Sequence, residues 1–202
     1  MITVDVWEKS FGSVPVLKGI RFTLQKGETL AILGPSGIGK TTLLRLIAGI
    51  DARYDGQITR PENIAIVFQE PVLLPWRTVI DNLLLVHPSL SRTAAWVALD
   101  EVGLGDKADH FPGQLSLGQQ RRLSLARGFA GQPELLIMDE PFVSLDAATA
   151  ETMLGLTEAL ITKTRPATIF VTHAPSEAER LATRILTLGG TPATLQKEEC
   201  LQ

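Results

Sequence analysis

One short motif limits the possible folds of this chain more than any other part of it: Gly34-Pro35-Ser36-Gly37-Ile38-Gly39-Lys40-Thr41. Its pattern is G-x-x-x-x-G-K-T, in which glycines let successive backbone N–H groups converge on a phosphate. The apolar run Thr29–Leu33 before it predicts a buried strand, and Thr42–Ala48 after it has helical spacing. A helix N-terminus adds partial positive charge to such a loop. These flanking elements argue against a glycine-rich turn that matches the pattern by chance.

Two side chains of the motif have the chemistry to act on a bound nucleotide triphosphate. The Lys40 ammonium can reach the β- and γ-phosphates, and the Thr41 hydroxyl can ligate Mg²⁺. With the residue that follows the motif, the predicted phosphate site comprises Gly34, Pro35, Ser36, Gly37, Ile38, Gly39, Lys40, Thr41 and Thr42.

A pair of adjacent carboxylates follows a second apolar run. Leu135–Met138 predicts a buried strand that ends in Asp139 and Glu140. Carboxylates at such a position are costly unless they have a role. Beside a phosphate loop, Asp139 can hold Mg²⁺, directly or through water, and Glu140 can polarise an attacking water. The alternative is two exposed carboxylates in a turn before Pro141.

Polar residues also end two other predicted strands. Gln69 follows the apolar run Ile64–Phe68, and His173 follows the strand predicted at Ala167–Thr172. Ligands of open α/β sheets bind at the carboxyl ends of the strands, so both side chains are candidates for the site. The alternatives are a solvated strand end for Gln69 and a structural role for His173, the role that we expect for His87 and His110.

The N-terminal third predicts short strands with tight turns. Apolar residues alternate with polar ones from Ile2 to Val6 and from Ile20 to Leu24, which indicates a small β-sheet within residues 1–33. Phe11 lies in a predicted loop, where an exposed aromatic ring can stack on a base; the alternative is a core position. A turn is expected around Tyr54-Asp55-Gly56.

Residues 70–129 predict helices rather than strands. Helical segments are expected at 79–86 and 94–99, and Ser116 has the chemistry to cap a helix from Gln119 to Phe129. That helix carries Arg121, Arg122 and Arg127, which we expect to form a solvated basic face. Trp76, in a Pro-Trp-Arg turn, either anchors a partner or packs into the helical core.

Composition narrows the function classes. A chain of 202 residues with a net charge of −3 gives no support for a nucleic-acid partner held by bulk electrostatics. The single cysteine, Cys200, excludes an intramolecular disulfide, which fits a reducing compartment. No apolar run reaches membrane-spanning length, and residues 1–8 do not have a signal-peptide pattern, so any membrane association is expected through a partner.

An ordered set of motifs resembles the ATP-binding subunit of ABC transporters. After the phosphate loop come Gln69, then Leu115-Ser116-Leu117-Gly118-Gln119, then Leu135–Glu140, then Ser144-Leu145-Asp146 and His173. The resemblance covers residues 2–188. Residues Val67–Val79, and the short connection between Gly56 and Ile64, are similar to the ATPases of bacterial nitrate, sulfonate and taurine importers.

The resemblance implies a role for each motif. Phe11 would stack on adenine beside Val16, and Gln69 would lie near Mg²⁺ and the γ-phosphate. Glu140 would be the catalytic carboxylate, and His173 would contact the γ-phosphate. Ser116, Gly118 and Gln119 would contact the γ-phosphate held by a second copy, with Asp146 across the dimer. Leu117 departs from the family pattern, which usually has glycine there, and this departure bears on the ATPase rate.

The patterns and the resemblance together predict an α/β fold: a P-loop NTPase core with a mainly parallel sheet, an N-terminal antiparallel β subdomain and an inserted helical subdomain. We expect one domain over residues 1–190, with its core at 1–69 and 130–190 and the helical subdomain at 70–129. Residues 191–202 are expected to form a polar, poorly ordered tail.

The expected function is ATP binding and hydrolysis, with Mg²⁺, to drive import through an integral-membrane permease. The resemblance implies a dimer of ATPase subunits, identical or not, and a solute-binding protein in the full system. It also implies a peripheral location at the cytoplasmic face of the inner membrane. One alternative is an ABC ATPase that acts on DNA or ribosomes. A P-loop kinase or GTPase is the other, but it would not explain residues 115–119, and we find no Asn-Lys-x-Asp guanine motif.

Overall fold

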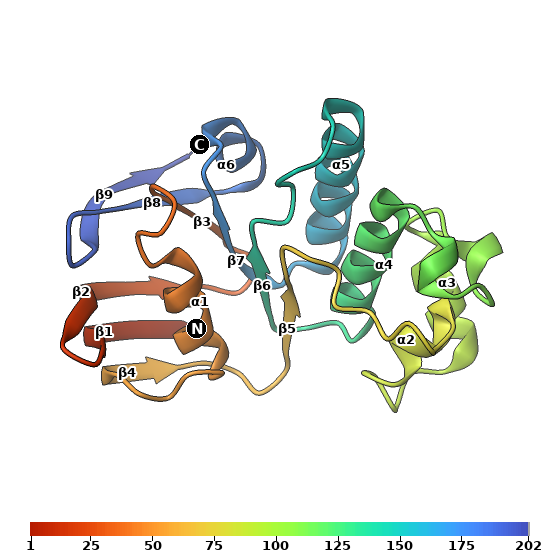
Figure 1. Cartoon of the computed structure of the whole chain (residues 1–202), viewed down its shortest axis with the longest axis horizontal. Helices are drawn as coiled ribbons and strands as arrows, with labels where there is room; N and C mark the ends of the chain where they lie inside the picture. Colours follow the sequence, from red (N-terminus) through yellow and green to blue (C-terminus); the bar gives the residue numbers. More distant parts are fainter. Residues whose placement is uncertain (202) are drawn as a thin grey trace.

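The computed structural model describes residues 1–201, and its strands form two sheets (Figure 1). The first is antiparallel, with the order β2-β1-β4: β1 is Ile2–Phe11, β2 is Val14–Leu24 and β4 is Asp55–Thr59. The alternating residues of β1 and β2 are buried on one face, as the sequence predicts. The turn expected around residues 54–56 is wrong in part, because Asp55 and Gly56 begin β4 and pair with β1. The sequence of β4 is polar and has no apolar run that would predict a strand. It is a strand because its backbone pairs with β1.

The second sheet has the order β5-β6-β7-β3-β8-β9. Its parallel strands are β3 (Thr29–Leu33), β5 (Ile64–Val67), β6 (Leu135–Asp139), β7 (Ala167–Thr172) and β8 (Arg184–Gly189). The expectation of a poorly ordered tail is wrong for most of its length. Residues Thr194–Cys200 form β9, which pairs antiparallel with β8 at the sheet edge. Its charged side chains suit an edge strand, and Gln202 lies outside the described residues.

Helices cover both faces of this sheet. Helix α1 (Lys40–Ala48) lies between the two sheets (Figure 1), and its leucines pack with Leu30, Ile32 and Ile137. The opposite face carries α4 (Leu117–Ala130), α5 (Ala147–Thr164) and α6 (Pro175–Leu181). Because successive strand residues point to opposite faces, β6 gives Leu136 and Met138 to this second core. The mainly parallel α/β core predicted from the sequence is confirmed.

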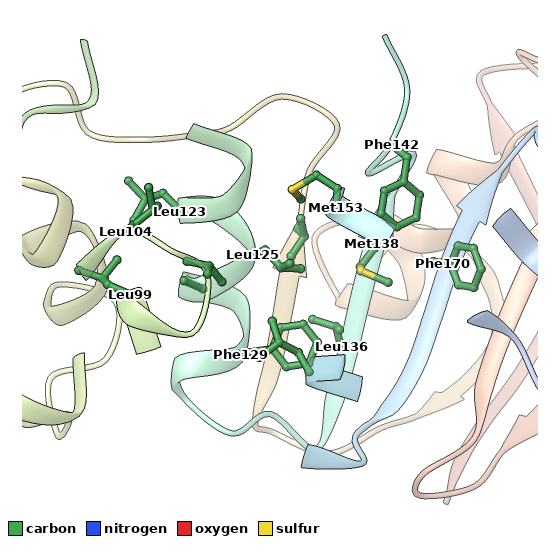
Figure 2. Close-up of a cluster of buried hydrophobic side chains, with 14 of the residues drawn as sticks. Leu99, Leu104, Leu123, Leu125, Phe129, Leu136, Met138, Phe142, Met153 and Phe170 are labelled. Carbon is green, nitrogen blue, oxygen red and sulfur yellow. The ribbon is translucent and has the colours of Figure 1, made fainter. Parts of the chain in front are cut away.

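The remaining helices gather on the side of β5 away from the antiparallel sheet (Figure 1). They are α2 (Val79–Leu84), α3 (Arg92–Asp100) and two 3₁₀ turns, Gly105–Lys107 and Pro112–Gln114. Figure 2 shows how α4 joins them to the sheet: Leu99, Leu104 and Leu123 pack on one side, and Phe129 packs near Leu136 on the other. One continuous hydrophobic cluster therefore fixes the helical region to the sheet.

The solvated basic face expected on α4 is wrong. Arg121 is 7% exposed and donates a hydrogen bond to the Pro141 carbonyl at 3.2 Å. Arg122 donates to the Val102 carbonyl, and Arg127 donates to the Val72 carbonyl. Burial lowers the pKa of Arg127 and of Arg121, while the negative charge of Glu70 opposes the shift at Arg121. These arginines link α4 to neighbouring loops, because the packing of the helix turns them inward.

Among residues 1–201, no helix has both the length and the apolar character that a membrane span requires.

Candidate nucleotide-binding site

A cavity of about 440 Å³ opens where the parallel strands β3, β5 and β6 end and the antiparallel sheet approaches them. Its volume suits a ligand of nucleotide size. The residues that line it come from both sheets and from the loop between β3 and α1: Phe11, Val16, Ser36, Gly37, Gly39, Lys40, Thr41, Thr42, Gln69 and Glu140. Residues distant in sequence thus meet at the sheet edge that the motif positions predicted.

The loop before α1 brings the N-terminus of this helix to the cavity. Gly39 caps the helix with a left-handed backbone, φ 112°, and no side chain caps the helix N-terminus. This backbone conformation favours glycine, and a Cβ atom at Gly39 would also lie 2.9 Å from Leu17 Cδ2 of β2, whose side chain would have to move. The free N–H groups and the helix dipole favour an anion at this end.

The Lys40 side chain lies buried beneath the loop. Its ammonium donates to the Gly34 carbonyl at 2.8 Å and to the Pro35 carbonyl at 3.1 Å. Glu140 Oε1 lies 3.5 Å from the same nitrogen. Gly34 and Pro35 therefore hold Lys40 in place, while Ser36 and Gly37 are exposed to the cavity. Ile38 is half-buried and closes the turn by donating its N–H to Pro35.

Thr41 and Asp139 bring two oxygens together at the adjacent strand end. The Thr41 hydroxyl donates to Asp139 Oδ1 at 3.1 Å, so the end of β6 meets the first turn of α1. Burial raises the pKa of Asp139 above its ordinary value, and the hydrogen bond from Thr41 partly offsets the increase. Both groups are hard oxygen donors, the chemistry that Mg²⁺ requires.

Glu140 occupies an unusual backbone position. Its φ is 46°, which non-glycine residues rarely adopt, and its N–H donates to the Val171 carbonyl of β7 at 3.1 Å. The side chain is 17% exposed and lines the cavity, with one oxygen toward Lys40 and the other 3.9 Å from His173 Nδ1. The alternative of two exposed carboxylates is wrong. Strain of this kind persists only when neighbouring structure imposes it, as at functional sites.

Three other predicted residues take different positions around the cavity. Phe11 is 51% exposed at the end of β1 and lines the cavity with Val16, so the core alternative for Phe11 is wrong. Gln69, just past β5, also lines it. His173 is exposed after β7 and approaches through Glu140 rather than by lining the cavity itself.

The predicted residues of α4 belong to another surface. Within residues 1–201, Ser116, Gly118 and Gln119 are not among the residues that line the cavity. Ser116 accepts the Gln119 N–H and donates its own N–H to the Gln119 side chain, a capping box that starts α4 at Leu117. The N-cap prediction for Ser116 is confirmed, with the helix starting at Leu117 rather than Gln119. Leu117 is exposed.

Asp146 caps the next helix in the same way. It accepts hydrogen bonds from the Thr149 N–H at 3.0 Å and from the Thr149 hydroxyl at 2.6 Å, and these bonds lower the pKa of Asp146. A Cβ atom on Gly118 would lie 3.2 Å from Thr149 Cγ2, so the starts of α4 and α5 are in contact. Ser116, Gly118, Gln119 and Asp146 therefore lie along one edge, where Ser116 and Asp146 are exposed and the other two are half-buried, and none of them lines the cavity described above.

Two residues near the site were missed by the sequence patterns. Arg121 holds the loop after Glu140 through the Pro141 carbonyl, and Lys9 is buried next to the Phe11 ring. A charged residue in an alternating strand or helix pattern is normally exposed, so nothing in the sequence indicated that either is buried.

Comparisons with known proteins agree with this geometry. Residues 17–143 match the sequence profile of the ABC transporter family. The chain is 44% identical, over 98% of its length and 81% of the relative's, to the aliphatic sulfonates import ATP-binding protein SsuB 3 of Paraburkholderia xenovorans. It is 46% identical, over 93% of its length and 78% of the relative's, to the SsuB 1 protein of Paracoccus denitrificans, which has the same description.

Solved structures give the same result for the fold. A dimeric, post-hydrolysis structure of the ATP-binding cassette MJ0796 with ADP and phosphate has a TM-score of 0.84 at 27% identity, covering 100% of this chain and 99% of that one. An inward-facing putative metal-chelate type ABC transporter has a TM-score of 0.85 at 28% identity, covering 97% of this chain and 82% of that one.

Proposed function

Because this chain belongs to the ABC transporter family as an ATP-binding subunit that hydrolyses ATP to drive import, we propose that its cavity at the carboxyl ends of β3, β5 and β6 is the ATP site. The single observation that carries the proposal is the convergence of Lys40, Thr41, Asp139 and Glu140 beneath free N–H groups of α1. Phe11 and Val16, at the opposite wall, are the proposed adenine contacts.

The phosphates would lie against the loop and the start of α1. Ser36, Gly37 and Gly39 offer backbone N–H groups, and Lys40 offers an ammonium that two carbonyls already orient. Thr42 lines the same cavity one residue further along α1. Gly34, Pro35 and Ile38 support the loop without lining the cavity.

The residues present fit a Mg²⁺ ion, which we propose as the cofactor. The Thr41 hydroxyl and the Asp139 carboxylate already meet at 3.1 Å, and Gln69 is a further candidate ligand. When bound, Mg²⁺ would neutralise charge on the β- and γ-phosphates.

Hydrolysis needs a base next to the γ-phosphate, and Glu140 is the proposed one. Its carboxylate lies between Lys40 and His173, so it can accept a proton from a water that attacks the γ-phosphorus. His173 would orient the same water or the γ-phosphate, since its ring is exposed at the cavity edge. Gln69, at the end of β5, would detect the γ-phosphate at the boundary with residues 70–129, which we propose as the helical subdomain.

Ser116, Gly118 and Gln119 would complete the site of a second copy. The N-terminus of α4 is exposed and carries an anion-favouring dipole, and the related MJ0796 cassette is dimeric. Asp146, at the same edge, would contact the partner subunit. ATP would then be shared between two chains, so that hydrolysis separates them and changes the conformation of the permease.

The transported solute is proposed from the relatives. Several are named aliphatic sulfonates import proteins, so we propose a small sulfonate as cargo, delivered by a solute-binding protein to an integral-membrane permease. The subunit would sit at the cytoplasmic face of the inner membrane through that permease. An ABC ATPase acting on DNA or ribosomes is not favoured, because these relatives are importer subunits.

Reconstitution with the permease of an aliphatic sulfonate importer tests the proposal. Vesicles that contain ATP inside, with a solute-binding protein added outside, should take up an aliphatic sulfonate. The Glu140→Gln variant should abolish this uptake. Uptake that persists without ATP would contradict the proposed function, whereas ATP-dependent uptake of a different anion only would overturn the sulfonate assignment.

A further inference from the structure

Lys9 is a buried cation that the proposed ATP site does not use. Its side chain is only 1% exposed, although it lies on β1, two residues before Phe11. A buried ammonium costs free energy unless charged or polar partners surround it. Lys9 therefore needs partners that offset the cost of burying its charge, and these partners indicate what the side chain does.

Two of the partners belong to the segment that follows α1. The Lys9 ammonium donates to Asp51 Oδ2 at 2.7 Å and to the Arg53 carbonyl at 2.6 Å. Asp51 is itself fixed, because its Oδ1 accepts the Arg53 N–H at 2.9 Å. The hydrogen bond from Lys9 is the main cause of the lowered pKa of Asp51, so the carboxylate stays ionised.

The third partner is the ring of Phe11. The Lys9 nitrogen lies over this ring, 4.6 Å from its centroid. A cation at this distance is attracted to the negative face of an aromatic ring. Since Lys9 is buried and Phe11 is half exposed in the cavity, the cation covers the inner face of the ring and leaves the outer face free.

We propose that Lys9 is a positioning residue for the nucleobase: from the buried side it fixes the Phe11 ring that stacks on adenine. The inference rests on the proposed role of Phe11 in the ATP site. Lys9 does not touch the nucleotide, so it acts only through the orientation of the ring.

The same contacts link the base site to the phosphate site. Asp51 and Arg53 lie just after Gly49, the C-cap of α1, while the first residue of that helix is Lys40. Lys9 therefore connects the Phe11 ring to one end of the helix whose other end faces the phosphates. This connection fixes the distance between the residues that contact the base and those that contact the phosphates. Binding of a triphosphate without a base would not depend on that distance.

The test compares a ligand with a base to one without. Lys9→Met keeps the length of the side chain but removes the charge. We expect ATP to bind about threefold to thirtyfold more weakly, the range of cation–π contributions, with inorganic tripolyphosphate binding unchanged by calorimetry. KM for ATP should rise by the same factor while kcat stays constant. Lys18→Met, which removes an exposed lysine from the neighbouring strand, is the control and should change the affinity for neither ligand.

A double-mutant cycle separates this inference from the function on which it rests. Phe11→Ala should weaken the binding of ATP but not that of tripolyphosphate. Adding Lys9→Met to the Phe11→Ala variant should then have no further effect on ATP binding. If Phe11→Ala does not alter ATP binding, the adenine contact itself is wrong. If Phe11→Ala weakens ATP binding but Lys9→Met does not, or if Lys9→Met weakens both ligands equally, Lys9 is structural only. Should Lys9→Met fail to fold, Lys9→Met/Asp51→Asn restores the charge balance and is compared in the same way.

Discussion

The ammonium of Lys40 lies 3.5 Å from the Glu140 carboxylate, so the cation expected to hold the phosphates already faces the base expected to activate water. Lys40 also donates to the Gly34 and Pro35 carbonyls. These carbonyls cannot match a phosphate in charge. We therefore expect a triphosphate to take over part of the hydrogen bonding of Lys40, at little cost in reorganisation.

Lys40→Ala should weaken ATP binding about tenfold to a hundredfold, since a charge-assisted hydrogen bond contributes roughly 1.5–3 kcal/mol. Titration calorimetry measures the change. Lys18→Ala, an exposed lysine on β2, is the matched control and should bind ATP as the wild type does. Equal affinities of the Lys40→Ala variant and the wild type would remove Lys40 from the phosphate site.

Glu140→Gln should bind ATP with normal affinity but hydrolyse it about 10²–10⁴ times more slowly, because the amide cannot accept the proton of the attacking water. Single-turnover hydrolysis separates chemistry from binding. The ATP-bound dimer should accumulate in light scattering. Near-normal hydrolysis by this variant would assign the base to another residue, with His173→Ala as the next variant to measure.

Asp139→Asn should stabilise the nucleotide-free protein at neutral pH. Burial raises the pKa of Asp139 in the fold above its ordinary 3.8, so the folded state favours the protonated form. The contribution of Asp139 to stability is complete below pH 3.8 and is lost as the pH rises through the raised pKa. Asparagine cannot ionise but can still accept the Thr41 hydrogen bond.

Thermal unfolding across the acid-to-neutral range measures this difference. The melting temperature of Asp139→Asn should exceed that of the wild type at neutral pH, and the gap should close toward acid. Weaker ATP binding in the presence of Mg²⁺ should accompany the gain in stability. If Asp139→Asn were less stable than the wild type at neutral pH, the ionised Asp139 carboxylate would be stabilised by the protein itself, without Mg²⁺.

Trp76→Ala should leave the fold intact. Trp76 is 69% exposed, so its core alternative is wrong, and we expect a stability change of about 0.5 kcal/mol or less. If Trp76 contacts the permease, reconstituted transport should fall while the ATPase of the isolated subunit persists. Trp7→Ala removes another exposed tryptophan, on β1, and is the control that should transport normally. Equal transport by the two variants would exclude Trp76 from the permease interface.

Ser116→Asp should block dimerisation without unfolding α4. Aspartate keeps the N-cap, while its charge repels a γ-phosphate presented by a second copy. Ser116→Asn also keeps the cap, is neutral and serves as the control. Ser116→Asp should still bind ATP as a monomer but hydrolyse it poorly, and mixing it with Lys40→Ala chains should restore at most one working site per dimer. Full hydrolysis by a monomeric Ser116→Asp protein would rule out the shared site.

The patterns that predicted the fold are local. Apolar runs identified β3, β5, β6 and β7. Strands buried on both faces, such as β3, β6 and β7, need no polar positions, and β5 at the sheet edge is half-buried. The residue after each run then marked the candidate site, since parallel strands end at one edge. Gly34–Thr41 needed only its own spacing and the two flanking elements to indicate a phosphate loop.

Tertiary structure alone decided which polar residues are buried and which aromatic residues are exposed. Strands β4 and β9 are too polar to be identified from periodicity, and they exist because β1 and β8 offer them backbone partners. Lys9 and Arg121 are charged residues whose burial depends on oxygens from distant segments, at Asp51 and Pro141. Burial is a property of what lies against a side chain, and those neighbours are distant in sequence.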